Sequence, residues 1–281
     1  MTRMASDTTS NPEIGSSVMV GPHLTNYHDR GSGDPVLLLH GSGPGVSAWA
    51  NWRLTFRDLA SDFRLVAPDQ LGFGFTMSPG DQQFTKTAWV EHIIGFLDVM
   101  QLPRVHVIGN SFGGAIALAL ASSYPERVDR LVLMGSAGAR FDITPGLDAV
   151  WGYTPSRENM HALMRVFAYD QNLISDDLVD MRYAASARPG VQESFARMFP
   201  APRQRWVDEL AMPDDALRSL EPRTLIVHGR DDRVIPLSSS LTLLDRIPDA
   251  RLHVFGRCGH WTQIEYADKF ATLVRCFLTE V

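Results

Sequence analysis

The sequence predicts an α/β protein with a mostly parallel, twisted sheet, helices on both faces and an inserted helical cap. Three observations lead to this prediction. Strand-like apolar runs alternate with helix-like runs along most of the chain, and one long interval interrupts that alternation. The chain has 281 residues, of which 44% are hydrophobic and 21% charged, which is enough for one large folded domain.

The alternation defines the expected core. Short apolar strands are expected at residues 36–39, 64–67, 105–108, 131–134, 224–227 and 251–255. Helices are expected at residues 49–59, 89–100, 238–246 and 267–278, and a further one after the turn GNSFGG. Strands that alternate with helices in this way are typical of a parallel sheet covered on both faces.

The interval 141–212 contains no clear strand. Met, Trp, Phe, Tyr and Arg occur there in helix-like segments that are separated by Pro145, Pro155, Pro189, Pro200 and Pro202. A long crossover is the simpler alternative, but connections usually have about 2–6 residues. We therefore expect a helical cap at 141–212 between core segments 1–140 and 213–281, with residues 1–11 disordered.

Composition restricts the class of protein. The net charge is −6, which argues against a nucleic-acid partner. Cys258 and Cys276 are the two cysteines, too few for a disulfide framework and in keeping with a reducing cytoplasm. A basic segment followed by an apolar one is missing at the N-terminus, and no apolar run reaches about 18 residues. We expect a cytoplasmic protein with no membrane segment.

Ser111 is the expected nucleophile. It stands in Gly-Asn-Ser-Phe-Gly, between the apolar run that starts at Val105 and a run of small and aliphatic residues. In such a strand–turn–helix the Ser backbone is strained and its hydroxyl projects above the sheet. Gly109 and Gly113 keep this corner free of Cβ clashes.

A Ser nucleophile needs a base, and the base needs an orienting acid. In this arrangement the partners follow in the order Ser, Asp, His. The stretch HGRDDRVIP supplies Asp231 and Asp232, and we favour Asp232 because it lies one residue further into the loop. The stretch GRCGHWTQIE supplies His260, the one histidine of nine with both the order and the loop setting.

The oxyanion hole is expected from two backbone N–H groups. One is on Phe112, directly after the nucleophile, and the other is on Ser42, in the loop HGSGPGVSAWANW after the first apolar strand.

These motifs belong to a wider pattern. Six stretches carry it: HGSGPGVSAWANWR, APDQLGFGFT, GNSFGG, RPGVQESFARMFPAPRQRW, HGRDDRVIP and FGRCGHWTQIE. On them the chain resembles the α/β-hydrolase family over nearly its whole length. More narrowly, it resembles the meta-cleavage product hydrolases, which hydrolyse a C–C bond in ring-fission products of catechols. A local departure is DQLGFGFTMSP, where the family pattern has Met-Leu or Met-Val after the Asp and an Arg before the Pro.

The resemblance implies substrates of the 2-hydroxy-6-oxohexa-2,4-dienoate type. It assigns the triad to Ser111, Asp232 and His260, and the dienoate site to Asn51, Asn110, Arg188 and Trp261. It also implies a homo-oligomer. Arg188 would bind the substrate carboxylate, since a guanidinium matches a carboxylate bidentately. The reaction requires no cofactor, and no metal-ligand cluster is visible in the sequence.

The acyl side of the site is expected to be apolar and small. The candidates come from the sheet edge, the cap and the Asp232 loop: Ala137, Phe141, Ile143, Trp151, Val207, Ile235 and Leu237. Their medium size indicates room for hydrogen or a small alkyl group at C6, although for each residue taken alone core packing is the better interpretation.

Two other functions use the same fold. A carboxylic-ester hydrolase would have the same triad, and a ligand receptor would have a vestigial one. Haloalkane dehalogenases and epoxide hydrolases have Asp where Ser111 stands, which disfavours them. For the C–C hydrolase, the attacking group would be Ser111 itself or a water activated by His260.

Overall fold

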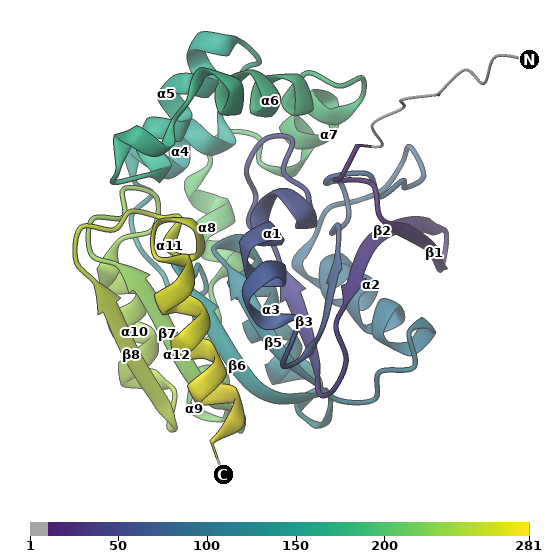
Figure 1. Cartoon of the computed structure of the whole chain (residues 1–281), viewed down its shortest axis with the longest axis vertical. Coiled ribbons are helices and arrows are strands. Elements are labelled where there is room, and N and C mark those ends of the chain that lie inside the picture. Colours follow the sequence, from purple (N-terminus) through teal and green to yellow (C-terminus); the bar gives the residue numbers. More distant parts are fainter. Residues whose placement is uncertain (1–10, 281) are drawn as a thin grey trace, which may run out of the picture.

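The computed structural model describes residues 11–280, and these form an eight-stranded sheet with helices on both faces (Figure 1). The strand order is β1-β2-β4-β3-β5-β6-β7-β8. The strands are β1 (Ser16–Val20), β2 (His23–Arg30), β3 (Pro35–Leu39), β4 (Arg64–Pro68), β5 (Val105–Asn110), β6 (Val128–Met134), β7 (Arg223–Gly229) and β8 (Ala250–Phe255). Only β2 runs against its neighbours, so the predicted mostly parallel sheet is confirmed.

The N-terminal strands β1 and β2 were not expected from the sequence. Strand β2 reads HLTNYHDR, which has none of the continuous apolar character of the central strands. A parallel strand buried on both faces requires such a run, whereas an antiparallel strand near the edge does not. The disorder expected for residues 1–11 concerns residues outside the described range, apart from Asn11.

The two faces of the sheet bury separate hydrophobic clusters. In β3, Val36 and Leu38 point to one cluster and Leu37 and Leu39 to the other. Side chains alternate between faces along a strand, so a continuous apolar run supplies both clusters. Helices α1 (Ala48–Leu59) and α12 (Ala267–Thr279) cover one face, and α2 (Lys86–Val99), α3 (Phe112–Ser123) and α10 (Leu237–Arg246) cover the other.

Helices alone connect β6 to β7 within the described chain. They are α4 (Pro145–Trp151), α5 (Arg157–Phe167), α6 (Asp176–Ser186), α7 (Val191–Met198), α8 (Gln204–Leu210) and α9 (Asp214–Arg218). Helices α4 to α7 form a cap above the end of the sheet in Figure 1. The remaining helical turns are η1 (Pro125–Arg127), η2 (Gln171–Leu173) and α11 (Thr262–Glu265).

Local sequence explains where the cap helices begin. Ser156 and Ser175 precede α5 and α6, and each hydroxyl accepts a hydrogen bond from a backbone N–H of the first turn. Thr144 does the same for α4, whose first residue is Pro145. Short polar side chains are favoured at the N-cap, and proline is tolerated at the first helical position.

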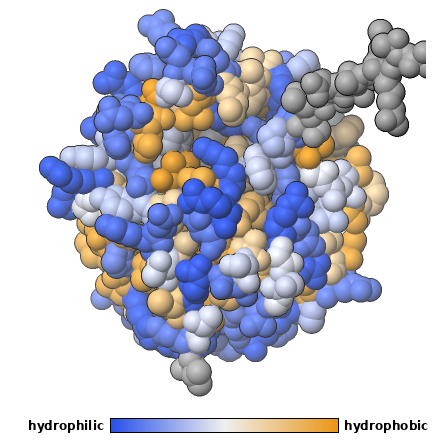
Figure 2. All heavy atoms as spheres, viewed as in Figure 1, coloured by the Kyte–Doolittle hydropathy of each residue, from blue (hydrophilic) through white to orange (hydrophobic). Residues whose placement is uncertain are grey.

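The molecular surface in the view of Figure 2 is mainly hydrophilic, with hydrophobic side chains in small groups. None of the helices within residues 11–280 combines the length and apolarity that a membrane span requires.

Candidate active site

Ser111 lies at the turn between β5 and α3, as predicted. Its φ is 55° and its ψ is −115°, a strained conformation for a residue with a side chain. The turn is too tight for side chains on its flanks. A Cβ on Gly113 would come 2.2 Å from the Leu39 carbonyl oxygen, and one on Gly109 would come 2.5 Å from the Gly113 carbonyl oxygen. The two glycines therefore allow the strand, turn and helix to meet under the Ser111 hydroxyl.

Asp232 and His260 meet beside Ser111. His260 Nδ1 donates to Asp232 Oδ2 at 2.6 Å, and the other oxygen of Asp232 accepts from the N–H groups of Val234 and Ile235 at 2.7 and 3.0 Å. The backbone N–H of His260 donates to the carbonyl oxygen of Phe167 in the cap at 2.7 Å. Both partners of the pair are thus held by backbone contacts.

Neighbouring residues support this choice of acid. Asp231 lies 3.5 Å from Arg230 and not against the histidine ring. A Cβ on Gly135, where φ is 49°, would lie 3.2 Å from both Asp232 Oδ2 and His260 Nδ1, so a side chain there would crowd the pair. The Ser111 hydroxyl makes no hydrogen bond to any residue in the range 11–280. Catalytic hydrogen bonds of this kind often tighten only when substrate binds.

Two backbone N–H groups near Ser111 are free to bind an oxyanion. Within the described residues, neither the Ser42 N–H nor the Phe112 N–H has a hydrogen-bond acceptor. The Ser42 hydroxyl accepts from Trp151 Nε1 at 2.9 Å, which ties the loop after β3 to helix α4.

His40 fixes the start of that loop. Burial lowers the pKa of His40 to about 4, so the ring is neutral at pH 7. Its Nδ1–H donates to the Gly41 carbonyl oxygen at 2.8 Å, and its Nε2 accepts from the Gln70 N–H at 3.0 Å. A neutral ring with one donor and one acceptor satisfies both contacts.

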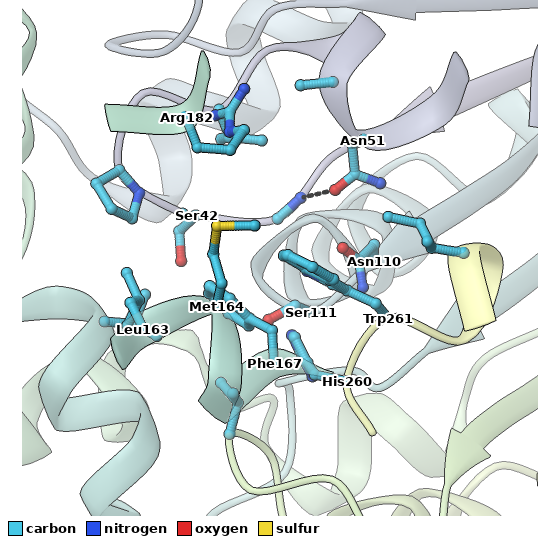
Figure 3. Close-up of a pocket in the computed structure, with 18 of the residues that line it drawn as sticks. Ser42, Asn51, Asn110, Ser111, Leu163, Met164, Phe167, Arg182, His260 and Trp261 are labelled. Carbon is cyan, nitrogen blue, oxygen red and sulfur yellow. Dashed lines mark hydrogen bonds between the residues drawn. The ribbon is translucent and has the colours of Figure 1, made fainter. Parts of the chain in front are cut away.

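A cavity of about 210 Å³ connects these groups. Ser42, Asn51, Asn110, Ser111, His260 and Trp261 line it, so six of the predicted site residues come together there. In Figure 3, Ser111 and His260 lie toward one end of the cavity and Arg182 toward the other. Trp261 stacks on Phe167, with ring centroids 5.2 Å apart.

Polar atoms in the cavity wall lack protein partners. Among the described residues, Asn51 Nδ2 and Gln263 Oε1 are buried without a hydrogen bond. Asn51 Oδ1 accepts from the Gly41 N–H at 3.3 Å, which orients the amide. A buried donor and a buried acceptor that are left open in a cavity are available to a polar ligand. Within the same part of the chain, no three His, Cys, Asp or Glu side chains gather closely enough to hold a metal ion.

Arg188 does not reach this cavity, contrary to expectation. It lies two residues beyond the end of α6, its Nη2 donates to the Gly74 carbonyl oxygen at 2.9 Å, and its guanidinium lies 3.8 Å from the centre of the Phe75 ring. It lines a second cavity of about 600 Å³. The arginines in the wall of the first cavity are Arg53, from α1, and Arg182, from the middle of α6.

Comparisons with known proteins identify the family to which this fold belongs. The model of the α/β-hydrolase fold matches residues 34–267. The chain is 57% identical over 271 residues to the 2-hydroxymuconate semialdehyde hydrolase of Pseudomonas sp. (strain CF600), covering 96% of each chain. It is 56% identical to the 2-hydroxy-6-oxo-2,4-heptadienoate hydrolase of Pseudomonas putida F1, covering 96% of this chain and 98% of the other.

The chain belongs to the meta-cleavage product hydrolases of the α/β-hydrolase family. A solved structure of such a hydrolase, from Pseudomonas fluorescens IP01, superposes with a TM-score of 0.94 at 58% identity and covers 95% of this chain and 98% of that one. The resemblance seen in the sequence, and the fold it implied, are thereby confirmed.

The predicted acyl pocket of this hydrolase is displaced in the structure. None of the seven candidates lines the catalytic cavity: Ala137, Phe141, Ile143, Trp151, Val207, Ile235 and Leu237. Ala137, Val207 and Ile235 are buried in the hydrophobic core, and Trp151 stacks on Phe199 with 4.5 Å between ring centroids. Ala137, Trp151, Val207 and Ile235 belong to the same hydrophobic cluster as wall residues such as Met164, but they do not themselves line the cavity.

Helix α5 supplies much of the wall instead. Met160, Leu163, Met164 and Phe167 follow the spacing i, i+3, i+4, i+7 and all line the cavity. That spacing marks an apolar helix face, which could have been identified in the sequence. No comparable pattern marks Arg53, Arg182 or Gln263, because a single polar residue on a helix does not reveal which way it faces.

Proposed function

We propose that this hydrolase cleaves the C5–C6 bond of 2-hydroxy-6-oxohexa-2,4-dienoates that carry hydrogen or a small alkyl group at C6. The products are 2-hydroxypenta-2,4-dienoate and a carboxylic acid. One observation carries the proposal: a single cavity has a Ser–His–Asp arrangement at one end and the arginines Arg53 and Arg182 at the other. That separation suits a substrate with a reactive ketone at one end and a carboxylate at the other.

The carboxylate end of the substrate needs a cation. We assign it to Arg182 with Arg53 beside it, in place of Arg188. A guanidinium binds a carboxylate through charge-assisted hydrogen bonds. The open Asn51 Nδ2 and Gln263 Oε1 suit the oxygen at C2, which changes from a hydroxyl to a carbonyl during the reaction.

The first chemical step is ketonisation. The dienol loses its C2 hydroxyl proton at the carboxylate end of the cavity and gains a proton at C5 at the catalytic end. His260 is the group that delivers the proton to C5. The C2 ketone, conjugated with the C3–C4 double bond, then provides a sink for the electrons of the C5–C6 bond. Without this step, C5 would leave as an unstabilised carbanion.

Bond cleavage follows at C6. Ser111 Oγ attacks the C6 carbonyl and gives its proton to His260, while the N–H groups of Ser42 and Phe112 bind the developing oxyanion. The C5–C6 bond breaks, its electron pair moves to the C2 oxygen, and protonation there gives the dienoate product. A water activated by His260 then releases the carboxylic acid from Ser111.

The size of the cavity and the named substrates of the relatives support the small C6 group. A volume of about 210 Å³ is modest for a conjugated six-carbon chain, and Met160, Leu163 and Met164 occupy the cap side. The relatives at 57% and 56% identity are named for a semialdehyde and a heptadienoate.

A spectrophotometric assay tests the proposal. Ring-fission dienoates with hydrogen, methyl or phenyl at C6 are coloured, and catalytic bleaching at a kcat/KM well above that for a p-nitrophenyl ester is the expected result. Preference for the ester would favour the carboxylic-ester hydrolase. At most one slow turnover per protein molecule on every substrate would favour the ligand receptor with a vestigial triad.

We also infer that the hydrolase acts in the cytoplasm as a homo-oligomer. Both cysteines are free, with Cys258 buried and Cys276 exposed, which suits a reducing compartment. The oligomer rests on the family resemblance. Sedimentation of the purified chain as a monomer at micromolar concentration would exclude it.

A further inference from the structure

Glu13 lies just before β1 and outside the catalytic cavity, yet its carboxylate reaches the wall of that cavity. It is a buried acid, only 7% exposed. One of its oxygens accepts from the Ser47 hydroxyl at 2.7 Å and the other from Arg182 Nη1 at 3.3 Å. The same guanidinium donates through Nη2 to the Gly45 carbonyl oxygen at 2.7 Å. Glu13 therefore links the N-terminal segment, the loop after β3 and the cap helix α6.

The backbone of Glu13 is itself held firmly. Its carbonyl oxygen accepts from Asn26 Nδ2 at 3.1 Å and from His28 Nε2 at 3.3 Å, both on β2. Its N–H donates to the side chain of Asn11 at 3.0 Å. A carboxylate on a fixed backbone, with one oxygen held by the Ser47 hydroxyl at 2.7 Å, makes a fixed point for a long, flexible arginine.

Arg182 needs such a fixed point. Burial and the positive charges of Arg53 and Arg188 lower the pKa of Arg182, and Glu13 acts in the opposite direction. The second cavity, of about 600 Å³, borders Arg53, Arg182 and Arg188 as well as Glu13. If the Glu13 charge were lost, repulsion among these partly buried arginines would favour movement of the Arg182 guanidinium into that space.

We propose that Glu13 is a positioning residue that holds Arg182 where it recognises the substrate carboxylate. This inference rests on the proposed function of the catalytic cavity and adds a residue to its carboxylate end. Glu13 contacts no reacting atom, so its effect should appear in KM for an anionic substrate and leave kcat nearly unchanged. A neutral ester, which has no carboxylate for Arg182 to bind, should be insensitive to Glu13.

The test compares Glu13→Gln, Glu13→Asp and Arg182→Met with the wild type on a C6-methyl dienoate and a p-nitrophenyl ester. The glutamine variant keeps the shape and the Ser47 contact but removes the charge, so we expect KM for the dienoate to rise about tenfold. The aspartate variant keeps the charge with a shorter reach and should recover part of the loss. Glu126→Gln, an exposed residue of η1, is the charge-matched control and should behave as wild type.

A double variant separates positioning from general weakening of the fold. If Glu13 acts through Arg182, then Glu13→Gln should add nothing to the KM of Arg182→Met. Unchanged ester kinetics in Glu13→Gln would show that the catalytic end is still folded. Equal losses on the dienoate and the ester would mean that Glu13 only stabilises the protein, and would overturn the inference.

Three further outcomes are decisive. A lower KM for the dienoate in Glu13→Gln would show that Glu13 competes with the substrate for Arg182, which contradicts positioning. If the wild type bleaches the dienoate and Glu13→Gln matches it, the positioning role is wrong and the proposed function stands. If the wild type does not bleach the dienoate at all, the proposed function itself fails.

Discussion

At the catalytic end of the cavity the functional groups are held by backbone contacts, whereas at the carboxylate end they are long side chains that need a counter-charge. Asp232 accepts from two backbone N–H groups, and His260 is bound through its own N–H to Phe167. Arg182 instead reaches across from the cap to Glu13 and Gly45. Chemistry needs atoms fixed within a fraction of an ångström, while recognition of a charge tolerates more movement.

The difference between the two ends has a consequence for mutation. Substitutions at the catalytic end should lower kcat on every substrate, because all of them use the same nucleophile and base. Substitutions at the carboxylate end should discriminate between anionic and neutral substrates.

The largest expected effect is that of Ser111→Ala. The turn carries no other hydroxyl in this position, so cleavage should fall by at least about 10⁴-fold on dienoates and on esters. Ketonisation should persist, because the proposed mechanism assigns that proton transfer to His260 and not to Ser111. Stopped-flow spectra should show the loss of dienoate absorbance that accompanies ketonisation, but neither 2-hydroxypenta-2,4-dienoate nor the carboxylic acid should be released, and Ser238→Ala, an exposed serine, is the control. Cleavage at the wild-type rate would show that Ser111 is not the nucleophile.

The next effect is that of Asp232→Asn, with Asp231→Asn as the matched neighbour. An asparagine at position 232 cannot hold the His260 ring with its proton on Nδ1, so kcat should fall about 10³–10⁴-fold. Asp231 lies against Arg230, and its variant should stay within about threefold of wild type. If the Asp231 variant were the slower of the two, the acid would be misassigned.

At the carboxylate end, Arg182→Met and Arg188→Met test which arginine binds the substrate carboxylate: Arg182, as proposed from the structure, or Arg188, as expected from the sequence. Loss of a charge-assisted contact should cost Arg182→Met about 10–100-fold in kcat/KM on dienoates and little on a neutral ester. Arg188→Met loses its contacts with Phe75 and Gly74 but none in the catalytic cavity, so its dienoate kinetics should change little. The reverse order of effects would restore the assignment to Arg188.

The cap side of the cavity should set substrate size. Met164→Ala opens space in the wall, and we expect kcat/KM for the C6-phenyl dienoate to rise about tenfold relative to the methyl compound. Val207→Ala removes a buried core group outside the wall. It should lower the free energy of unfolding but leave the ratio of kcat/KM for the phenyl and methyl dienoates unchanged. A wild type that prefers phenyl would contradict the small acyl site.

The smallest effect concerns pH and stability near α1, the helix that carries Asn51 and Arg53. Burial raises the pKa of Asp69 to about 7 although Ala48 N–H, Phe75 N–H and Asn26 donate to its carboxylate. Since the folded protein then holds a proton that the unfolded chain releases near pH 4, the free energy of unfolding should fall as pH rises from about 4 to about 7.

Urea unfolding of the wild type and Asp69→Asn at pH 5 and pH 8 measures this contribution. The wild type should lose on the order of a few kcal/mol more than the variant between the two pH values. Equal losses would mean that Asp69 is ionised in the folded protein throughout this range.

Much of the fold could be predicted because its signals are local. The central strands are buried on both faces, so each is a continuous apolar run, and the cap is an interval without such runs. Strand β1 lies at the sheet edge and is mostly exposed, and β2 beside it buries polar side chains such as Thr25, Asn26 and His28, so neither sequence is a continuous apolar run.

The sequence by itself determined which residues are proposed for the catalytic end. Ser111 is specified by a turn that only glycines at 109 and 113 can flank, and Asp232 and His260 each follow a strand whose end is fixed by the sheet. The tertiary structure alone decided the carboxylate and acyl ends. Whether Arg182 or Arg188 faces the cavity depends on where α6 ends, and whether Val207 or Met164 forms the wall depends on how the cap packs against the sheet. Those are contacts between segments far apart in the chain. The spacing of Met160, Met164 and Phe167 marks an apolar face on α5, but neither residue type nor spacing encodes which surface that face meets.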